Sequence, residues 1–392
     1  MGNAHGRTLR VGLIGTGVGV RTYLPGFAAT GRAAVVALSG SGPERAREVA
    51  AATGVPTAYA DHRELCADPT LDVICVASPN EFHREHYLAA VASGRHVLIE
   101  KPPVDTGAEL AELLAVDTAP GQLVLVDHQL RFNPYLRALR EVIRSGELGR
   151  PYQVRIHQQG VGLLSPDVGH SWRFDADRGG GVRLAMGSHL VDLMFFLLGD
   201  VPVRSVLGGE DVVVPVRRDA AGQARTVTAD SAFAALLAGD SLTVSLSASA
   251  AAATENILDV DVLGTAGEAH FSLDGKLRVG TSAGRRDVRP PEVSPDELHN
   301  RVSVFKTSFV HLAGALADAV LDGRWTALEP ACRLPDQVPT LRVLDAMLAS
   351  ARTGDAVRLD APPTPAARGV TATAATGAAA VQFPSAEIRT LG

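Results

Sequence analysis

The sequence predicts an α/β protein in which a doubly wound parallel sheet is followed by a second domain built on a largely antiparallel or mixed sheet. Its 392 residues suffice for two domains. Residues 9–126 alternate strand-like and helix-like runs, the order that builds a parallel sheet with covering helices. From Val203 to Val279, strand-like runs follow one another with Gly and Asp between them, which predicts antiparallel pairing.

In the first domain, expected over residues 1–127, five apolar and β-branched runs indicate strands. They are Leu9–Ile14, Ala33–Leu38, Val73–Ala77, His96–Ile99 and Leu123–Val126. Helices are expected between them, and Gly54 and Gly94 end the second and third. These helices are Arg21–Thr30, Glu44–Thr53, Phe82–Ser93 and Gly107–Asp117, and the first of them contains Pro25.

The second domain is expected over residues 128–360. Three predicted helices are Pro134–Ser145, 182–198 and Leu341–Ala351. A fourth is indicated by apolar residues that recur with a 3.6-residue period, namely Phe305, Phe309, Leu312, Leu316 and Val320. The clearest strands are Tyr152–Gln159, Ser241–Ala248 and Ile257–Leu263, and Pro335 and Pro339 are expected in a loop. Residues 361–392 are rich in Ala, Thr and Pro and are predicted to be disordered.

The composition excludes several classes of function. A net charge of −6 and a pI near 6.1 argue against a nucleic-acid surface. Cys66, Cys75 and Cys332 lie far apart, so neither a zinc site nor a disulfide frame is expected. The N-terminus is polar, which argues against a signal peptide, and no apolar run reaches the ~18–20 residues that a membrane span needs. A cytoplasmic protein with no metal, membrane or nucleic-acid partner is therefore expected.

Lys101 is the most informative single position. The strand His96–Ile99 ends in Glu100, Lys101 and Pro102, and strand interiors accept neither a lysine nor a following proline readily. The strand therefore places an ammonium at its carboxyl end, where open parallel sheets bind their ligands.

A glycine-rich turn follows the first strand and precedes the first helix. Its residues are Gly15, Thr16, Gly17, Val18, Gly19 and Val20. Glycines in this position let the backbone approach a pyrophosphate, which then lies at the helix N-terminus. Val20 stands where a third small residue is usual, and Gly19 is an additional glycine. Because the turn opens a β-α-β series, dinucleotide binding is favoured over a plain tight turn.

The end of the second strand addresses the choice of nucleotide. NAD-binding folds usually have an acidic residue there, which holds the ribose 2′-hydroxyl. The segment from Leu38 to Gly42 has no carboxylate, and Ser39, Ser41 and Arg45 offer hydrogen bonds to a 2′-phosphate. The sequence therefore favours NADP over NAD.

Further motifs accompany the glycine turn and the Glu100–Lys101–Pro102 strand end. They are Ser78-Pro79-Asn80-Glu81-Phe82-His83, Arg131-Phe132-Asn133-Pro134, Gly146-Glu147-Leu148-Gly149, Gly179-Gly180-Gly181 and Gly187-Ser188-His189-Leu190-Val191-Asp192. The set resembles the Gfo/Idh/MocA oxidoreductase family over about residues 9–360. That resemblance implies a Rossmann domain and a C-terminal α+β domain with a large, mostly antiparallel open sheet, whose face often forms a dimer or tetramer interface.

The resemblance also implies site residues. The nicotinamide side of the cofactor would be lined by Ser78, Pro79, Asn80, His83, Glu100 and Lys101. Lys101 would also contact the substrate, and His189 would be the general acid/base, for which an unperturbed pKa near ~6.5 is suitable. Four of these residues have structural alternatives. His83 can simply pack or cap its helix, and Asn80 can serve as an N-cap. Lys101 can be a solvated lysine at a strand end, and His189 can be a satisfied core histidine.

Other polar residues are candidates for the substrate wall. His128 and Arg131 follow the last strand of the first domain, although Arg131 can equally pair with a carboxylate alone. His170, Trp172 and Arg173 lie together in one loop, where the tryptophan face would suit sugar C–H groups. The alternative is an ordered surface loop.

One departure from the family pattern affects the chemistry. The family usually has an aspartate four residues before the catalytic histidine, but this chain has Ala185. By sequence, the nearest possible substitutes are Asp167, His170 and Asp175, whereas Asp192 is expected to be a structural contact.

The sequence therefore predicts an NAD(P)-dependent oxidoreductase that transfers hydride between nicotinamide and a sugar or polyol. Because of Ala185, two alternatives stay open: a non-redox or internally redox-neutral enzyme on the same scaffold, and a nucleotide-binding regulator without turnover. A homodimer or homotetramer assembled through the C-terminal sheet is expected.

Overall fold

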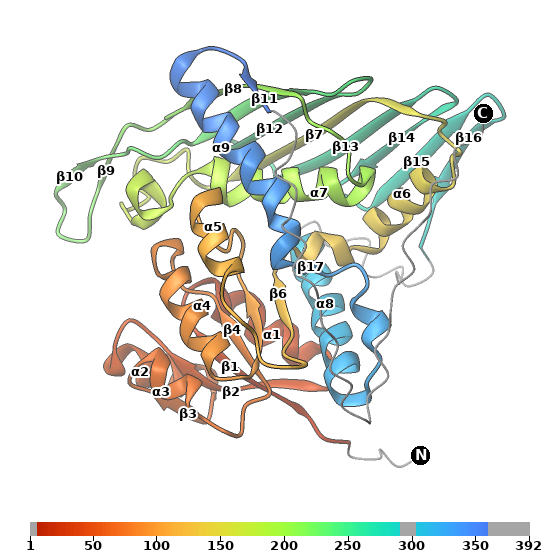
Figure 1. Cartoon of the computed structure of the whole chain (residues 1–392). Coiled ribbons are helices and arrows are strands. Elements are labelled where there is room, and N and C mark those ends of the chain that lie inside the picture. The colour runs from red at the N-terminus through yellow and green to blue at the C-terminus, as the bar shows by residue number, and fades with distance from the viewer. Residues whose placement is uncertain (1–5, 291–302, 360–392) are drawn as a thin grey trace. The chain divides into compact units, whose positions relative to one another are not determined.

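A seven-stranded sheet forms the lower half of the computed structural model in Figure 1, which describes residues 6–290 and 303–359. The strand order is β17-β6-β5-β4-β1-β2-β3, parallel except for β17. The strands are β1 (Leu9–Ile14), β2 (Ala33–Ser39), β3 (Thr57–Tyr59), β4 (Val73–Val76), β5 (His96–Ile99), β6 (Val124–Val126) and β17 (Cys332–Arg333). This is the doubly wound Rossmann arrangement that the alternating runs predict.

Helices cover both faces of this sheet. One face packs against α1 (Val18–Ala29), α2 (Pro43–Thr53) and α8 (Ser303–Asp322). The other packs against α3 (His62–Cys66), α4 (His83–Ala92) and α5 (Gly107–Leu114). Neither β3 nor α3 was predicted, because elements of three and five residues are too short to show a periodic pattern.

The chain returns to the first sheet late in the sequence. Phe309 of α8 stacks on Tyr23 of α1, with ring centroids 4.5 Å apart and planes 4° apart, and meets Phe27 edge-on at 5.3 Å. Gly26 makes this approach possible, since a Cβ at that position would lie 2.4 Å from the Phe309 ring. Residues that the sequence assigns to the second domain thus complete the core of the first.

The second sheet has nine strands in the order β16-β15-β14-β13-β7-β12-β11-β8-β18. Its neighbours are antiparallel except for the parallel pair β7–β12. The strands are β7 (Pro151–Val161), β8 (Ser205–Asp211), β11 (Ala232–Ala238), β12 (Thr243–Ala252), β13 (Ile257–Gly264), β14 (Gly267–Ser272), β15 (Lys276–Thr281), β16 (Gly284–Val288) and β18 (Val357–Arg358). A separate ribbon pairs β9 (Val216–Arg218) with β10 (Ala224–Thr226).

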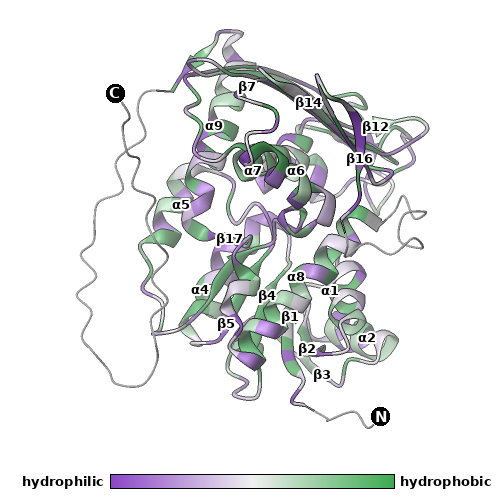
Figure 2. Cartoon of the chain, turned by 90° about the vertical axis from the view of Figure 1, so that its right-hand side faces the viewer, coloured by the Kyte–Doolittle hydropathy of each residue, from purple (hydrophilic) through white to green (hydrophobic). Residues whose placement is uncertain are grey.

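Three helices lie along one face of the nine-stranded sheet: α6 (Pro134–Arg144), α7 (Ser188–Leu198) and α9 (Gln337–Thr353) (Figure 1). Figure 2 shows α7 as a strongly hydrophobic helix beneath the sheet, consistent with nine buried residues among its eleven. A π-helical turn at Arg183–Gly187 leads directly into α7. The predicted helix 182–198 is therefore continuous, but its first turn has π-helical rather than α-helical hydrogen bonds.

Two helical segments pass a length-and-hydropathy test for membrane spans, contrary to the sequence expectation. They are Ala176–Leu198 and Val304–Asp322. Buried residues make up 72% of the tested window in the first and 50% in the second. Core helices of globular proteins pass the same test, and one or two such segments are weak evidence for a membrane.

Other predicted boundaries also differ from the structure. The helix α1 begins at Val18 rather than Arg21, directly on the glycine turn. Pro339, expected in a loop, lies in the first turn of α9, where a proline costs no internal hydrogen bond. The expected disorder at residues 361–392 lies outside the described residues.

The Tyr23–Phe309 stack provides a stability test. Replacing Phe309, which is fully buried, with alanine should lower the free energy of unfolding by about 3–5 kcal/mol through lost burial and a cavity. Phe82→Ala is the matched control, because Phe82 is 42% exposed and should cost about 1 kcal/mol or less. Equal losses in urea unfolding of the two variants would contradict this packing.

Candidate active site

The glycine turn has the geometry that a dinucleotide needs. Gly15 has φ +112°, and a Cβ there would lie 2.4 Å from the Ala77 carbonyl oxygen, so a side chain is excluded. A Cβ at Gly17 would meet nothing within 4 Å, which leaves the backbone open to a ligand. Gly19 packs the helix on the strand, since its Cβ would lie 2.7 Å from Leu13. Gly19 thus takes the packing role of the third glycine, which explains why Val20 is tolerated.

The N-terminus of α1 is open to an anion as well. Its N-cap is Gly17, and no side chain caps it. The first backbone N–H groups of the helix therefore have no intrahelical or side-chain partner, the usual condition for pyrophosphate binding. The turn and helix together fit a nicotinamide dinucleotide.

The end of β2 lies beside this turn. The Gly15 N–H donates to the Ser39 carbonyl at 2.9 Å, and a Cβ at Gly40 would lie 3.1 Å from the Thr16 methyl group. A side chain at position 40 would therefore point toward the glycine turn. The Ser39 hydroxyl is buried without a partner among the described residues, and Ser41 is exposed. Arg45 pairs with Glu48 at 2.7 Å.

His83 ties together the two loops expected to line the nicotinamide. Its Nε2 lies 2.9 Å from the Ser78 carbonyl oxygen, and its Nδ1 lies 2.9 Å from the Pro102 carbonyl oxygen. Burial lowers its pKa to about 4. The Lys101–Pro102 peptide bond held in this way is cis. His83 is 1% exposed, so it supports the loops from behind rather than facing a ligand.

Asn80 connects the first domain to the glycine triplet. Its Nδ2 donates to the Gly179 carbonyl at 3.0 Å and to Asp105 Oδ1 at 3.3 Å. The predicted N-cap role for Asn80 is wrong, because α4 begins at His83 and no side chain caps it. The Asn80 amide instead positions the segment that leads into the π-helical turn.

Lys101 reaches across to that turn. Its Nζ donates to the backbone carbonyl of Ala185, the position where the family pattern has an aspartate. Burial lowers the Lys101 pKa from its usual value, Glu100 and Asp127 raise it, and Arg173 lowers it. The Ala185 carbonyl thus gives the Lys101 ammonium a hydrogen-bond acceptor, which the Ala185 methyl group cannot provide.

His189 lies one helical turn after Ala185 and shares this site. It is 5% exposed, and its Nδ1 is buried with no hydrogen-bond partner among the described residues. Its ring lies 5.3 Å from Phe305 and 5.5 Å, edge-on, from His128. Burial, followed by the charges of Lys101 and His128, holds the His189 pKa well below 6.5. The imidazole is therefore neutral at pH 7, which departs from the unperturbed value assumed from sequence.

Arg131 does not line the site with a free guanidinium. It donates two hydrogen bonds to Asp192, at 2.9 Å from Nε and 2.7 Å from Nη2, and a third to Asp336 at 3.4 Å. This arrangement supports the alternative in which Arg131 pairs with a carboxylate. It also gives Asp192 the structural role expected from the sequence.

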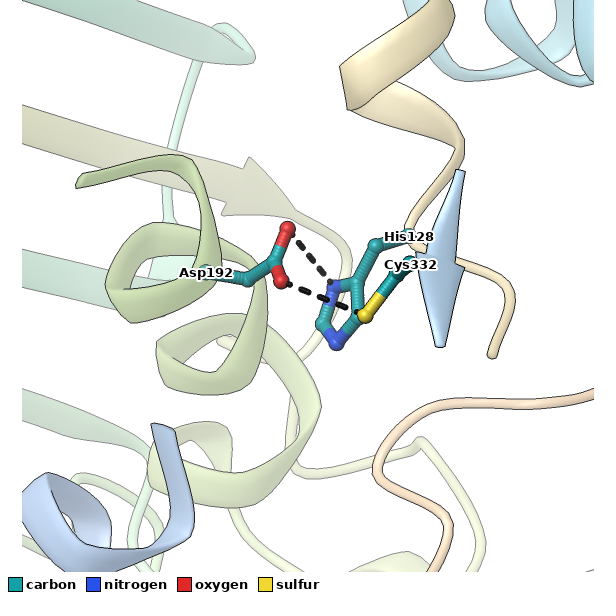
Figure 3. Close-up of side chains that lie close together, drawn as sticks. All are labelled: His128, Asp192 and Cys332. Atoms are coloured by element: carbon teal, nitrogen blue, oxygen red, sulfur yellow. Dashed lines mark hydrogen bonds and ion pairs between the residues drawn. The ribbon is translucent and has the colours of Figure 1, made fainter. Parts of the chain in front are cut away.

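His128 belongs to the same buried network (Figure 3). Its Nδ1 lies 3.6 Å from Asp192 Oδ2, and its Nε2 lies 3.1 Å from Gln337 Oε1. Burial lowers the His128 pKa to about 4. The residue therefore backs His189 rather than presenting a polar group to a substrate.

By spacing alone, His128, Asp192 and Cys332 could hold a metal ion, since their ligand atoms lie within 4.8 Å of one another. Both oxygens of Asp192 already accept hydrogen bonds from Arg131. Burial raises the pKa of the Cys332 thiol well above its usual range, so the thiolate form that binds metals is disfavoured. The site does not fit a cation, and no metal role is assigned to it.

The predicted substrate loop divides into two parts. Arg173 lies over the Trp172 ring, with its guanidinium carbon 5.0 Å from the ring centroid, and its charge lowers the Lys101 pKa. Arg21 of α1 likewise lowers the Arg173 pKa, after burial. Arg173 therefore lies near Lys101, and Trp172 lies beside Arg173. His170 instead packs beside Phe174, at 6.0 Å between ring centroids.

None of the substitutes named from sequence replaces the missing carboxylate. Asp167 is exposed and bonds to Ser165, and Asp175 accepts the Asp177 N–H as a local cap. Two buried residues not selected from sequence, Tyr23 and Asp127, lie close enough to Lys101 or Glu100 to interact electrostatically. Asp127 directly follows a strand, and that was the signal that could have identified it.

Comparisons with known proteins agree with this geometry. A family model described as an oxidoreductase family with an NAD-binding Rossmann fold matches residues 9–128, and the GFO/IDH/MocA C-terminal domain matches residues 136–270. The chain belongs to the Gfo/Idh/MocA family. The expected Rossmann domain, with its NAD-binding fold, and the C-terminal domain with a mostly antiparallel sheet are confirmed.

Several members of the family are similar to this chain. 1,5-Anhydro-D-fructose reductase from Ensifer adhaerens is 33% identical over 50% of the chain and 59% of its own length. D-xylose 1-dehydrogenase (NADP(+)) 2 from Haloferax volcanii is 28% identical over 89% of the chain and 99% of its own length. Levoglucosan dehydrogenase, solved with NADH and L-sorbose, has a TM-score of 0.77 at 22% identity, covering 90% of this chain and 99% of its own.

Many of these matches are partial. Alignments with three curated relatives, including the Ensifer adhaerens reductase, cover 59%, 56% and 51% of their lengths. The solved structures, at 20–23% identity, support the shared fold alone.

The Asp192 network provides a second test. Asp192→Asn removes the charge facing a buried guanidinium and should lower the free energy of unfolding by about 3–5 kcal/mol. The matched control is Asp240→Asn, which breaks an exposed, solvent-screened pair with Arg204 and should leave the free energy of unfolding nearly unchanged. If urea denaturation shows Asp192→Asn to be as stable as the control, the network does not carry the structural role assigned to it.

Proposed function

We propose that this chain is an NAD(P)-dependent oxidoreductase that transfers hydride between nicotinamide and a sugar or polyol hydroxyl or carbonyl. The observation that carries the proposal is the convergence of Lys101 and His189. They come from different domains, and they meet because the Lys101 ammonium bonds the Ala185 carbonyl one turn before His189. Lys101 follows β5 at the sheet edge where the glycine turn follows β1, and open parallel sheets bind their ligands at that edge.

The bound nucleotide would supply the hydride acceptor or donor at nicotinamide C4. In alcohol oxidation, the chain has to hold the hydroxyl oxygen and remove its proton as the carbon loses hydride. Lys101 Nζ is a donor suited to hold the oxygen, and the neutral His189 imidazole is in the protonation state that accepts the proton. In the reverse direction the same histidine would have to return a proton to the carbonyl oxygen.

The substrate region supports a sugar or related polyol. The Trp172 ring lies beneath the guanidinium of Arg173, whose charge acts on Lys101, and an aromatic face of this kind suits sugar C–H groups. Arg173 beside it supplies hydrogen-bond donors. Relatives named as acting on D-xylose, 1,5-anhydro-D-fructose and D-glucosides are consistent with this class.

NADP is the favoured nucleotide. The loop between β2 and α2 contains no carboxylate to repel a 2′-phosphate, and the α2 N-terminus at Gly42 has no side-chain cap. Ser39 and Ser41 remain the candidate hydroxyl donors, whereas Arg45 is paired with Glu48.

A cytoplasmic homo-oligomer is the proposed setting. The face of the nine-stranded sheet opposite α6, α7 and α9 carries directly paired Leu207 and Leu236, each 46% exposed. Apolar side chains in that position suit an interface between copies of the chain. Sedimentation of wild type against Leu207→Glu would test it, since the charge should dissociate the assembly.

Stopped-flow absorbance at the reduced-nicotinamide band, with a panel of sugars and polyols, tests the activity. A net signal that scales with substrate supports the dehydrogenase. A transient that returns to baseline would instead support an internally redox-neutral enzyme, and no change despite tight nucleotide binding would overturn both. Ala185 is the observation that keeps the redox-neutral alternative in consideration.

Lys101→Met should reduce turnover by about 10²–10⁴-fold, because the substrate oxygen loses its cationic donor. Nucleotide affinity should stay within a few-fold, as the glycine turn is untouched. Lys276→Met is the control, since Lys276 pairs with Asp274 on the second sheet, far along the chain from the site. Near-normal turnover of Lys101→Met would refute the assignment.

The nucleotide preference gives a further prediction. Fluorescence titration should show tighter binding of NADP(H) than of NAD(H) to the wild type. Gly40→Asp should reverse the order, because its carboxylate would point toward Thr16, repel a 2′-phosphate and accept a 2′-hydroxyl. A wild type that prefers NAD(H) would contradict the argument from the loop.

A further inference from the structure

Two carboxyl groups lie buried side by side at the carboxyl end of the parallel sheet. Glu100 follows β5 and Asp127 follows β6, and the last residues of these strands, Ile99 and Val126, are paired in register. The Asp127 N–H donates to the Ile99 carbonyl at 2.8 Å, which continues the pairing by one residue. Glu100 is 9% exposed and Asp127 is fully buried.

These carboxyls have few conventional partners. Glu100 Oε2 accepts the Lys101 N–H at 3.1 Å. Both oxygens of Asp127 and the Tyr23 hydroxyl are buried, and none of them makes a hydrogen bond of good geometry to the described residues. The Tyr23 hydroxyl and the Gln129 N–H are nevertheless close enough to Asp127 to lower its pKa, and Tyr23 also lowers the pKa of Glu100. Burial, followed by the charges of Asp127 and Glu100, raises the Tyr23 pKa. The buried pair is therefore only weakly hydrogen-bonded, which is uncommon enough to require an explanation.

The electrostatics of the pair follow from its burial. Burial, followed by repulsion from Glu100, raises the Asp127 pKa well above its usual value, and burial also raises that of Glu100. Lys101 lowers both. Two adjacent buried carboxyls cannot both ionise readily, because the charge left by the first proton opposes the loss of the second.

The carboxyl pair faces the Lys101 ammonium. Around Lys101, the charged and titratable groups are Glu100 and Asp127 from the strand ends, Arg173 from the substrate loop, His83 of α4, and His189 with His128 behind it. Around the pair lie Tyr23 of α1 and Cys75 of β4. Only the pair is acidic near Lys101 in this set, since Ala185 offers a carbonyl and no carboxylate.

We propose that Asp127 and Glu100 form a singly protonated carboxyl pair that balances the Lys101 ammonium, with Asp127 taking the place of the carboxylate that the family pattern has at position 185. Asp127 is then a positioning residue that acts through Lys101. The inference rests on the proposed function only in giving Lys101 its task, because the charge balance exists in nucleotide-free protein.

The chain is well suited to a direct test, because it has only three lysines, Lys101, Lys276 and Lys306. Protein labelled with [ε-13C]lysine gives few enough NMR signals for Lys101 to be assigned by its loss in Lys101→Arg. Titration of the nucleotide-free protein then reports the Lys101 pKa in wild type, Asp127→Asn, Glu100→Gln and the double variant.

A shared proton predicts non-additive shifts. Each single variant leaves one carboxyl, which loses its proton and keeps the charge at minus one, so the Lys101 pKa should move little. The double variant removes the charge and should lower the Lys101 pKa by about 1–3 units. Asp259→Asn removes a negative charge from β13 of the second sheet and is the control. It should leave the Lys101 pKa unchanged.

If the double variant folds and its Lys101 pKa equals that of the wild type, the charge balance is contradicted. If the Lys101 pKa shifts of the two single variants add up to the shift of the double variant, the two carboxyls do not share a proton. A loss of the infrared carboxylic-acid C=O band at pH 7 in Asp127→Asn should accompany the predicted pattern. If the protein does turn over a sugar, the alkaline limb of its pH–rate profile should shift with the Lys101 pKa in the double variant. Failure to find any substrate would leave the titration result intact, so the two proposals fail separately.

Discussion

The partial burial of one ammonium group is the constraint on which the rest of the site depends. Lys101 stands at the end of β5 beneath the second domain, where loss of hydration destabilises its charge. The surroundings compensate in two ways: the Ala185 carbonyl accepts a hydrogen bond, and the carboxyls at the ends of β5 and β6 provide opposite charge. A dehydrogenase site needs such a donor held in place before its substrate arrives, because reorganisation at the moment of reaction would add to the barrier.

The scaffold around Lys101 shows how that position is maintained. His83 joins the loops after β4 and β5, and Asn80 bonds the Gly179 carbonyl in the second domain. Behind His189, Asp192 accepts two hydrogen bonds from Arg131, and the His128 Nδ1 lies 3.6 Å from the same carboxylate. The result is a neutral histidine and a charged lysine within electrostatic reach of each other, each fixed from behind by residues that do not face the ligand.

The sequence predicted those parts that depend on local pattern. The glycine turn, the lysine at a strand end and the histidine after Gly187 are readable because short-range geometry dictates them. It did not predict the return of α8 to the first sheet or the partners of Arg131, since these depend on residues as far apart in sequence as Tyr23 and Phe309. The substitutes expected for the missing aspartate, Asp167, His170 and Asp175, are its neighbours in sequence. The carboxyls that act on Lys101 instead directly follow β5 and β6, far from Ala185 along the chain.

We propose that Lys101 and His189 together flank the reacting atoms. A crystal structure with NADP(H) and a bound sugar would test this arrangement. We expect the pyrophosphate at the N-terminus of α1, nicotinamide C4 facing a substrate carbon, and the oxygen on that carbon within hydrogen-bond distance of both Lys101 Nζ and the His189 ring. A sugar bound with its oxygens away from both side chains, or a nicotinamide turned out of the site, would contradict it.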